Sequence, residues 1–191
     1  MAGKQAKTLD KSQLADVLIE TSKARYPTRD RAIVLLSARA GLRAGEIAKL
    51  TWPMLTTADG QLADCIELHD RAAKKRSGRT IPLHPDLRSS LARLHRSADL
   101  SGPVILSERG GAMTPSSMVT WFWRLYKRMG LVGCSSHSGR RTFITRAAQK
   151  VHLTGGSIRD VQQLAGHRSL SQTQAYIEGN TDAQRRLVRL L

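Results

Sequence analysis

The sequence contains few of the features that mark secreted or membrane proteins. Its 191 residues include only two cysteines, Cys65 and Cys134, which are too few and too far apart for a disulfide framework or a zinc site. The N-terminal MAGKQAKTLD lacks the apolar stretch of a secretory signal, and no apolar run is long enough to span a bilayer. We therefore expect a protein of the cytoplasm or nucleoid that makes no contact with membranes.

Acidic residues are also scarce, because 15 Asp and Glu stand against 31 Lys and Arg, which gives a formal net charge of +16. So large a positive charge favours a polyanionic partner, above all nucleic acid. The charge is not confined to a tail, since residues 121–191 hold 12 basic and 3 acidic side chains within segments of helical periodicity. It does not distinguish a protein that binds nucleic acid from an enzyme that acts on it.

A hydrophobic fraction of 40% over this length is enough for one domain with a buried core. Apolar periodicity predicts helices at about 8–24, 28–40, 42–50, 85–97, 115–129, 138–151, 157–165, 171–177 and 182–190. Alternating segments at 63–69 and 79–84, joined by a basic turn, predict two strands. The expected fold is mainly α with a small antiparallel β-sheet (α+β), and we expect Trp121, Phe122 and Trp123 to face its core.

Four separated segments hold the side chains that phosphodiester chemistry needs. An arginine can donate two hydrogen bonds to one phosphate, and a histidine can move protons near neutral pH. A lysine can protonate a leaving oxygen, and a tyrosine can attack phosphorus. No carboxylate cluster is present to hold Mg²⁺, so we expect neither a metal nor a cofactor, and cations would neutralise the phosphate instead. The candidate side chains are Arg43, Lys74, His137, Arg140, His167 and Tyr176.

Each of these features also has an ordinary structural interpretation when it is taken alone. Arg43 can pair with Glu46 at a helix start, and most basic turns like the one at 71–78 are simply solvated. His167 can cap a helix, and Tyr176 can be a half-buried core residue. The agreement of all four segments in order and spacing favours the functional interpretation.

The four segments resemble the signature boxes of the tyrosine recombinase, or phage integrase, family. A Gly-Leu-Arg-x-x-Glu box lies at Gly41–Glu46, a His-x-x-Arg box at His137–Arg140 and a Leu-x-Gly-His box at Leu164–His167, nine residues before Tyr176. In the family, a lysine in the turn lies five residues before an arginine, and this arginine leads into an Ile-Pro-Leu strand. That arginine is Arg79, which selects Lys74 over Lys75.

The resemblance implies a site-specific DNA recombinase that cleaves and rejoins strands through a 3′-phosphotyrosyl intermediate. Tyr176 would be the nucleophile, with Arg43, Arg140 and His167 on the scissile phosphate. Lys74 would be the general acid for the 5′-oxygen, His137 an acid or base near the tyrosine, and Glu46 a support for Arg43. We expect further DNA contacts from the remaining basic residues nearby, which are Lys75, Arg76, Arg79, Arg141 and Arg168.

The same resemblance covers residues 8–180 as a catalytic domain, after a flexible N-terminus at 1–7. It implies double-stranded DNA as partner, a homotetramer on DNA in which residues 181–191 dock onto a neighbouring protomer, and accessory DNA-bending proteins. A phage, a mobile element or a bacterial nucleoid would be the setting. Full-length members usually add an N-terminal helical DNA clamp, so the chain resembles the short fimbrial-switch type or an isolated catalytic domain. The family's usual leucine before Arg140 is Gly139, which we expect to loosen local packing.

Two other functions fit parts of the pattern. A non-catalytic DNA-binding regulator on the same fold would keep the charge, but it would not need Tyr176 or both arginines. A type IB topoisomerase shares the tyrosine chemistry and relaxes supercoils without exchanging strands. The spacing from the Leu-Ala-Gly-His box to Tyr176 favours the recombinase.

Overall fold

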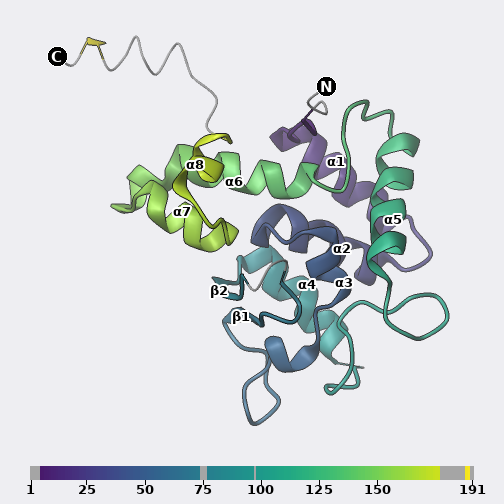
Figure 1. The fold of residues 1–191 in the computed structure, drawn as a ribbon. Coiled ribbons are helices and arrows are strands. Elements are labelled where there is room, and N and C mark those ends of the chain that lie inside the picture. Colours follow the sequence, from purple (N-terminus) through teal and green to yellow (C-terminus); the bar gives the residue numbers. More distant parts are fainter. Residues whose placement is uncertain (1–4, 74–76, 97, 177–187, 190–191) are drawn as a thin grey trace.

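A computed structural model describes residues 5–73, 77–96, 98–176 and 188–189, and it confirms a mainly α fold with a small antiparallel sheet (Figure 1). Lys74, Lys75, Arg76 and most of 177–191 lie outside the described residues. The helices are α1 Lys11–Ser22, α2 Pro27–Ala40, α3 Ala44–Ala48, α4 Pro85–His95, α5 Pro115–Arg128, α6 Ser138–Lys150, α7 Ile158–Ala165 and α8 Leu170–Gln174. Short 3₁₀ turns lie at Trp52–Met54 and Val151–Thr154, and the strands are β1 Cys65–Leu68 and β2 Arg79–Pro82.

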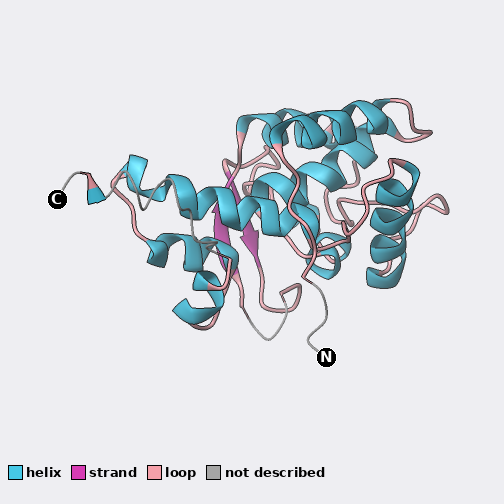
Figure 2. Cartoon of the chain, turned by 90° about the horizontal axis from the view of Figure 1, so that it is seen from above, coloured by secondary structure: helices cyan, strands magenta, loops and turns pink. Residues whose placement is uncertain are grey.

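The two strands form one antiparallel hairpin, seen among the surrounding helices in Figure 2. Ile66 pairs with Ile81, and both side chains are buried, while Glu67 opposite Thr80 faces solvent. This alternation places one face of the hairpin on the core. It also fixes the first residue of β2, Arg79, beside Leu68 at the end of the sheet where the basic turn begins.

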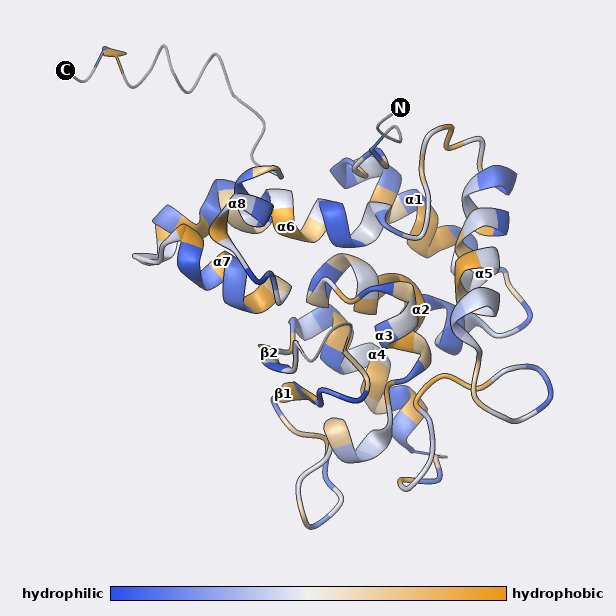
Figure 3. Cartoon of the chain, in the orientation of Figure 1, coloured by the Kyte–Doolittle hydropathy of each residue, from blue (hydrophilic) through white to orange (hydrophobic). Residues whose placement is uncertain are grey.

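Helix α2 runs through the centre of the molecule and packs against α1, α4 and α6. Every residue of α2 from 32 to 38 is buried, as expected of a helix that is packed on several sides. Figure 3 shows much of α7 as hydrophilic. A smaller cluster of Ile144, Val161 and Ala165 joins α6 to α7, and Tyr176 packs against it. Among the described residues, no helix is long and apolar enough to cross a bilayer.

One expectation about the chain's packing, that of the aromatic residues on α5, differs from the structure. Phe122 is fully buried, but Trp123 is 53% exposed, with the Lys127 ammonium 4.7 Å from its ring centre. Of the N-terminal residues expected to be flexible, residues 5–7 are described, and Lys7 donates its backbone N–H to the Gly133 carbonyl at 3.0 Å. Leu9, two residues later, is 1% exposed. The chain is therefore anchored before α1 begins.

A second difference concerns Gly139, which lies where α6 packs against α2. A Cβ atom at this position would lie 2.4 Å from Ser37 Oγ and 2.9 Å from Ser37 Cβ. Real Cβ atoms do not approach other heavy atoms so closely. The glycine therefore tightens the contact between the two helices instead of loosening it.

Candidate active site

The first part of the site is the start of α3, where Glu46 accepts hydrogen bonds from Arg43. Glu46 Oε2 accepts from the Arg43 backbone N–H at 2.9 Å, and Oε1 accepts from Arg43 Nη1 at 2.6 Å. An acidic residue in the first turn of a helix reaches back to the unpaired N–H groups there, which explains the Arg-x-x-Glu spacing. The carboxylate is 2% exposed, so Arg43 is held by a buried partner.

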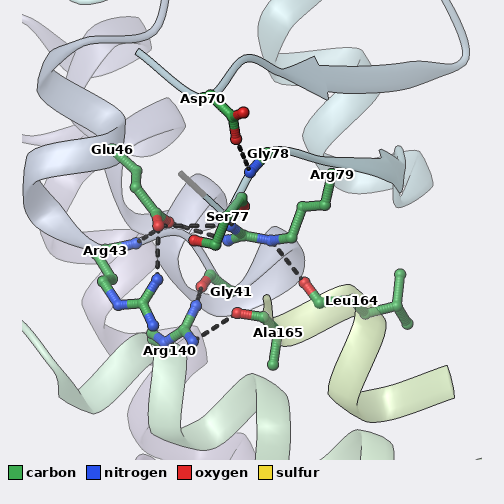
Figure 4. Close-up of polar contacts among 10 residues, drawn as sticks. All are labelled: Gly41, Arg43, Glu46, Asp70, Ser77, Gly78, Arg79, Arg140, Leu164 and Ala165. Carbon is green, nitrogen blue, oxygen red and sulfur yellow. Dashed lines mark hydrogen bonds and ion pairs between the residues drawn. The ribbon is translucent and has the colours of Figure 1, made fainter. Parts of the chain in front are cut away.

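Arg79 joins the same carboxylate from β2. Its Nη2 donates to Glu46 Oε2 at 2.9 Å, so Glu46 lies between two guanidinium groups (Figure 4). Burial raises the pKa of Glu46, but the hydrogen bond and charge of Arg79, together with Arg43, hold that pKa below its usual value. Glu46 therefore remains ionised at neutral pH and fixes both arginines.

Arg140 projects from α6 toward the same region, beside Arg43 (Figure 4). Nη1 donates to the Gly41 carbonyl at 2.6 Å, and Nη2 donates to the Ala165 carbonyl at 2.7 Å. Burial, followed by the charge of Arg43, lowers the pKa of Arg140 to about 10. The side chain is still a cation at neutral pH, and it joins the end of α2 to the end of α7.

His167 follows the left-handed Gly166 that ends α7, and Tyr176 lies over its ring. The ring centres are 5.3 Å apart with 26° between the planes, and His167 Nδ1 lies 3.0 Å from the Thr173 hydroxyl. Burial, and then the charges of Arg140, Arg43 and Arg79, lower the pKa of His167 to about 4. At neutral pH the imidazole is therefore neutral, and it is suited to donate a hydrogen bond.

A cavity of about 410 Å³ lies beside Arg140 and Tyr176. Its lining includes His137, Arg140, Arg141 and Tyr176. Gln5 and Ala6 line the same cavity, and the Gln5 side-chain oxygen accepts a hydrogen bond from Arg141. The start of the described chain thus forms part of the cavity wall.

The structure brings together most of the side chains that the sequence motifs identified. Arg140 lies near Arg43, His167 and Tyr176. Arg140 and Tyr176 line the cavity, and His137 joins them there at the start of α6. Arg168 is exposed just beyond His167, and the three basic residues 74–76 lie outside the described residues.

Arg79 differs from its predicted placement as a DNA contact, because its side chain is only 6% exposed and bonds within the protein. Sequence reasoning also missed Thr173, which is fully buried against His167, and Gln5. The only sequence signal for Thr173 is its distance of three residues from Tyr176, which places both near one face of a helical turn.

This arrangement is suited to a bound phosphodiester. Three guanidinium groups surround one carboxylate, which leaves an excess of positive charge where a phosphate would lie. Nowhere among the described residues do three or more His, Cys, Asp or Glu side chains gather as a metal site would require. The phenol of Tyr176 is a nucleophilic group in the cavity lining, next to Arg140, and the Ser135 hydroxyl lines the same cavity.

A model of the phage integrase family matches residues 7–182. This chain belongs to the phage integrase family. Among curated relatives, the tyrosine recombinase XerA of Pyrococcus furiosus is 30% identical over 78% of this chain and 49% of its own length. The tyrosine recombinase XerC of Rickettsia prowazekii is 29% identical over 92% of this chain and 58% of its own length. This chain therefore spans about half the length of these relatives.

Solved structures share the fold of this chain. The Tn1549 transposon integrase in complex with a circular intermediate DNA superposes with a TM-score of 0.77, at 20% identity, covering all of this chain and 67% of the other. The crystal structure of XerA recombinase gives a TM-score of 0.72 at 24% identity, covering 97% of this chain and 65% of the other. The helical architecture and its small sheet are therefore those of tyrosine recombinases.

Proposed function

We propose that this chain is the catalytic part of a site-specific DNA recombinase that acts through a 3′-phosphotyrosyl intermediate. The observation that carries the proposal is the position of Tyr176, which lines the cavity with Arg140 and stacks on His167. A nucleophile beside a cluster of fixed cations is the arrangement that phosphoryl transfer requires. Membership of the phage integrase family and the DNA complex of the Tn1549 relative support the same proposal.

The proposed reaction exchanges one phosphate ester for another, so the energy of the phosphodiester bond is kept in the link to Tyr176. The phenolic oxygen of Tyr176 attacks the scissile phosphorus, the bond from phosphorus to the 5′-oxygen breaks, and the 5′-hydroxyl leaves with a proton from Lys74. Arg43 and Arg140 neutralise the charge on the non-bridging oxygens, while neutral His167 donates one hydrogen bond. His137, on the cavity wall, accepts the phenol proton. Reversal with another 5′-hydroxyl rejoins the strands, so the cycle consumes no ATP.

Charge supports double-stranded DNA as the substrate. The net charge of +16 favours binding along a phosphate backbone, with an affinity that falls as salt rises. Arg141 at the cavity and exposed Arg168 beside His167 are placed to contact phosphates next to the scissile one. Lys75 and Arg76, in the basic turn, extend this proposed contact.

A supercoiled plasmid assay tests the proposed function. A plasmid with two copies of the target site should give recombined products, whereas a plasmid without the sites should remain unchanged. Candidate sites come from covalent adducts mapped on genomic DNA near the chain's own gene. Relaxation that does not depend on the sites would indicate a topoisomerase, and retardation of the DNA without any cleavage would indicate a regulator. Either result would contradict the proposal.

The proposed assembly is a tetramer on two DNA sites, joined through the C-terminal segment. Residues 181–191 include Leu187, Val188, Leu190 and Leu191, an apolar set suited to docking on a neighbouring protomer. Deleting 181–191 should reduce the cooperativity of binding to paired sites by about tenfold or more, while binding to a single site changes little. Electrophoretic titration of one-site and two-site DNA measures both quantities. Cooperativity that survives the deletion would contradict the docking role.

A further inference from the structure

Arg79 uses its guanidinium group almost entirely within the protein. Nη2 donates to Glu46 Oε2 at 2.9 Å, Nε donates to the Leu164 carbonyl at 2.9 Å, and Nη1 lies 3.3 Å from the Ser77 carbonyl and 3.4 Å from Glu46 Oε1. The side chain is 6% exposed. All three of its nitrogen atoms, Nε, Nη1 and Nη2, have acceptors within the protein, which indicates a role in holding the site together.

The contacts of Arg79 connect two of the sequence boxes. Through Glu46 the guanidinium group reaches Arg43, and through the Leu164 carbonyl it reaches the turn that carries His167. Leu164 and Ala165 are the last two residues of α7, where carbonyls have no partner within the helix and the helix dipole is negative. Arg79 holds the first of these carbonyls and Arg140 holds the second, so two cations from different elements fix the end of α7.

Gly166 supplies independent support for this placement of Arg79. Its φ is +63°, and a Cβ atom there would lie 2.8 Å from Arg79 Nη1 and 3.0 Å from Arg79 Cδ. The arginine therefore lies directly against the backbone of the turn. The glycine in the Leu-Ala-Gly-His box provides both the left-handed conformation and the space that Arg79 occupies.

We propose that Arg79 is a positioning residue for DNA cleavage, which holds Arg43, through Glu46, and the His167 turn in one fixed geometry without touching DNA. This inference rests on the proposed recombinase function. Its physical basis is that one planar guanidinium group bonds the carboxylate and the helix end at the same time. A lysine has a single ammonium on a flexible stem and cannot reproduce that geometry.

Loss of Arg79 also has an electrostatic consequence at Glu46. The charged groups around this carboxylate are Arg43 on α3, Arg79 on β2 and Arg140 on α6, with His167 beyond them. Burial already raises the pKa of Glu46, and Arg79 gives the largest opposing contribution. Without Arg79 the pKa rises, so the carboxyl becomes protonated at a higher pH and holds Arg43 less firmly. The acid limb of the cleavage rate should move to higher pH.

The test compares Arg79→Met, Arg79→Lys and the wild-type chain in single-turnover cleavage of a suicide DNA substrate at saturating DNA. We expect Arg79→Met to cleave about 10- to 100-fold more slowly, the range typical of residues that orient catalytic groups. Its Kd and the salt dependence of that Kd should stay within about twofold of wild type, since no phosphate contact is lost. Arg79→Lys should recover part of the rate and most of the acid limb, because it keeps the charge.

Controls separate positioning from folding and from DNA contact. Arg88→Met makes the same change at an exposed arginine paired with Asp64 and should leave cleavage unchanged. Thermal unfolding identifies a misfolded variant. If Arg79→Met is unfolded, Arg79→Lys decides, because the inference expects it to cleave more slowly than the wild-type chain at an unchanged Kd. Weaker DNA binding with a salt slope reduced by about one, and normal cleavage at saturation, would mean that Arg79 contacts DNA and would overturn the inference.

The same experiment distinguishes failure of this inference from failure of the proposed function. If the wild-type chain forms the covalent adduct and Arg79→Met forms it at the same rate and pH dependence, the positioning role alone is wrong. If the wild-type chain forms no adduct on its mapped site, the proposed function is wrong and this inference with it.

Discussion

Replacing Tyr176 by phenylalanine should abolish the covalent protein–DNA adduct and leave DNA binding intact. The substitution removes only the phenolic oxygen, and loss of a nucleophile lowers the rate of such reactions by about 10⁴-fold or more. The ring keeps its stacking on His167 and its packing against the cluster of Ile144, Val161 and Ala165. A suicide substrate, which traps the adduct for denaturing electrophoresis, measures the loss, and a binding titration measures what is retained.

A matched control for this prediction is Tyr126→Phe. Tyr126 is 1% exposed in α5, and burial raises the pKa of its phenol far above the usual value, so this oxygen takes no part in chemistry at the cavity. The control should form the adduct at the wild-type rate. An adduct trapped by Tyr176→Phe would show that another residue attacks the DNA and would refute the proposed mechanism.

The second large effect is expected at the crossing of α2 and α6. Alanine is more favourable than glycine in a helix interior by about 1 kcal/mol, so a change from glycine to alanine stabilises a helix where the new Cβ atom meets no neighbour. Here the new Cβ atom would lie 2.4 Å from Ser37 Oγ, 2.9 Å from Ser37 Cβ and 3.3 Å from the Ala38 nitrogen, so rotation of the hydroxyl cannot relieve the contact. Overpacking of this kind costs about 1–3 kcal/mol. We expect a net loss of stability, measured by denaturant unfolding.

Catalysis should suffer more than stability from Gly139→Ala, because α6 carries Arg140 on the next residue. A displacement of about 1 Å in a catalytic group can reduce the rate by about 100-fold. Adding Ser37→Gly removes both clashing side-chain atoms, so the double variant should lose less stability than the two single changes together. Gly111→Ala, which meets no atom within 4 Å, should change nothing. Wild-type stability and cleavage in Gly139→Ala would mean that the helices are not in close contact.

The secondary structure and the local parts of the site were predictable from the sequence. The Arg43–Glu46 pair follows from its spacing at a helix start, and the buried Ile81 follows from strand alternation. Three consecutive aromatics on α5 could not all face the core, because successive helical residues differ by about 100°. In the structure Phe122 is buried, whereas Trp123 is exposed and its ring contacts Lys127.

The parts that sequence reasoning could not give are contacts between distant segments. The sequence shows that the residue at the start of the second strand is basic, but it does not show which group that residue contacts. It therefore predicts a DNA contact for Arg79, whereas in the structure Arg79 donates hydrogen bonds to Glu46 and to the Leu164 carbonyl. Comparison with the family's usual leucine predicts looser packing at Gly139. The effect of this glycine on packing depends instead on Ser37, which lies 102 residues earlier on another helix. Such pairings depend on how helices cross, and no local pattern encodes them.

The contribution of Gln5 and Ala6 to the cavity wall has a practical consequence for handling this protein. Because Lys7 and Leu9 are fixed to the body of the chain, a substitution or a chemical label at Gln5 or Ala6 changes the cavity wall itself. A sample with the native residues at these two positions is therefore the proper reference for every rate measured on the protein.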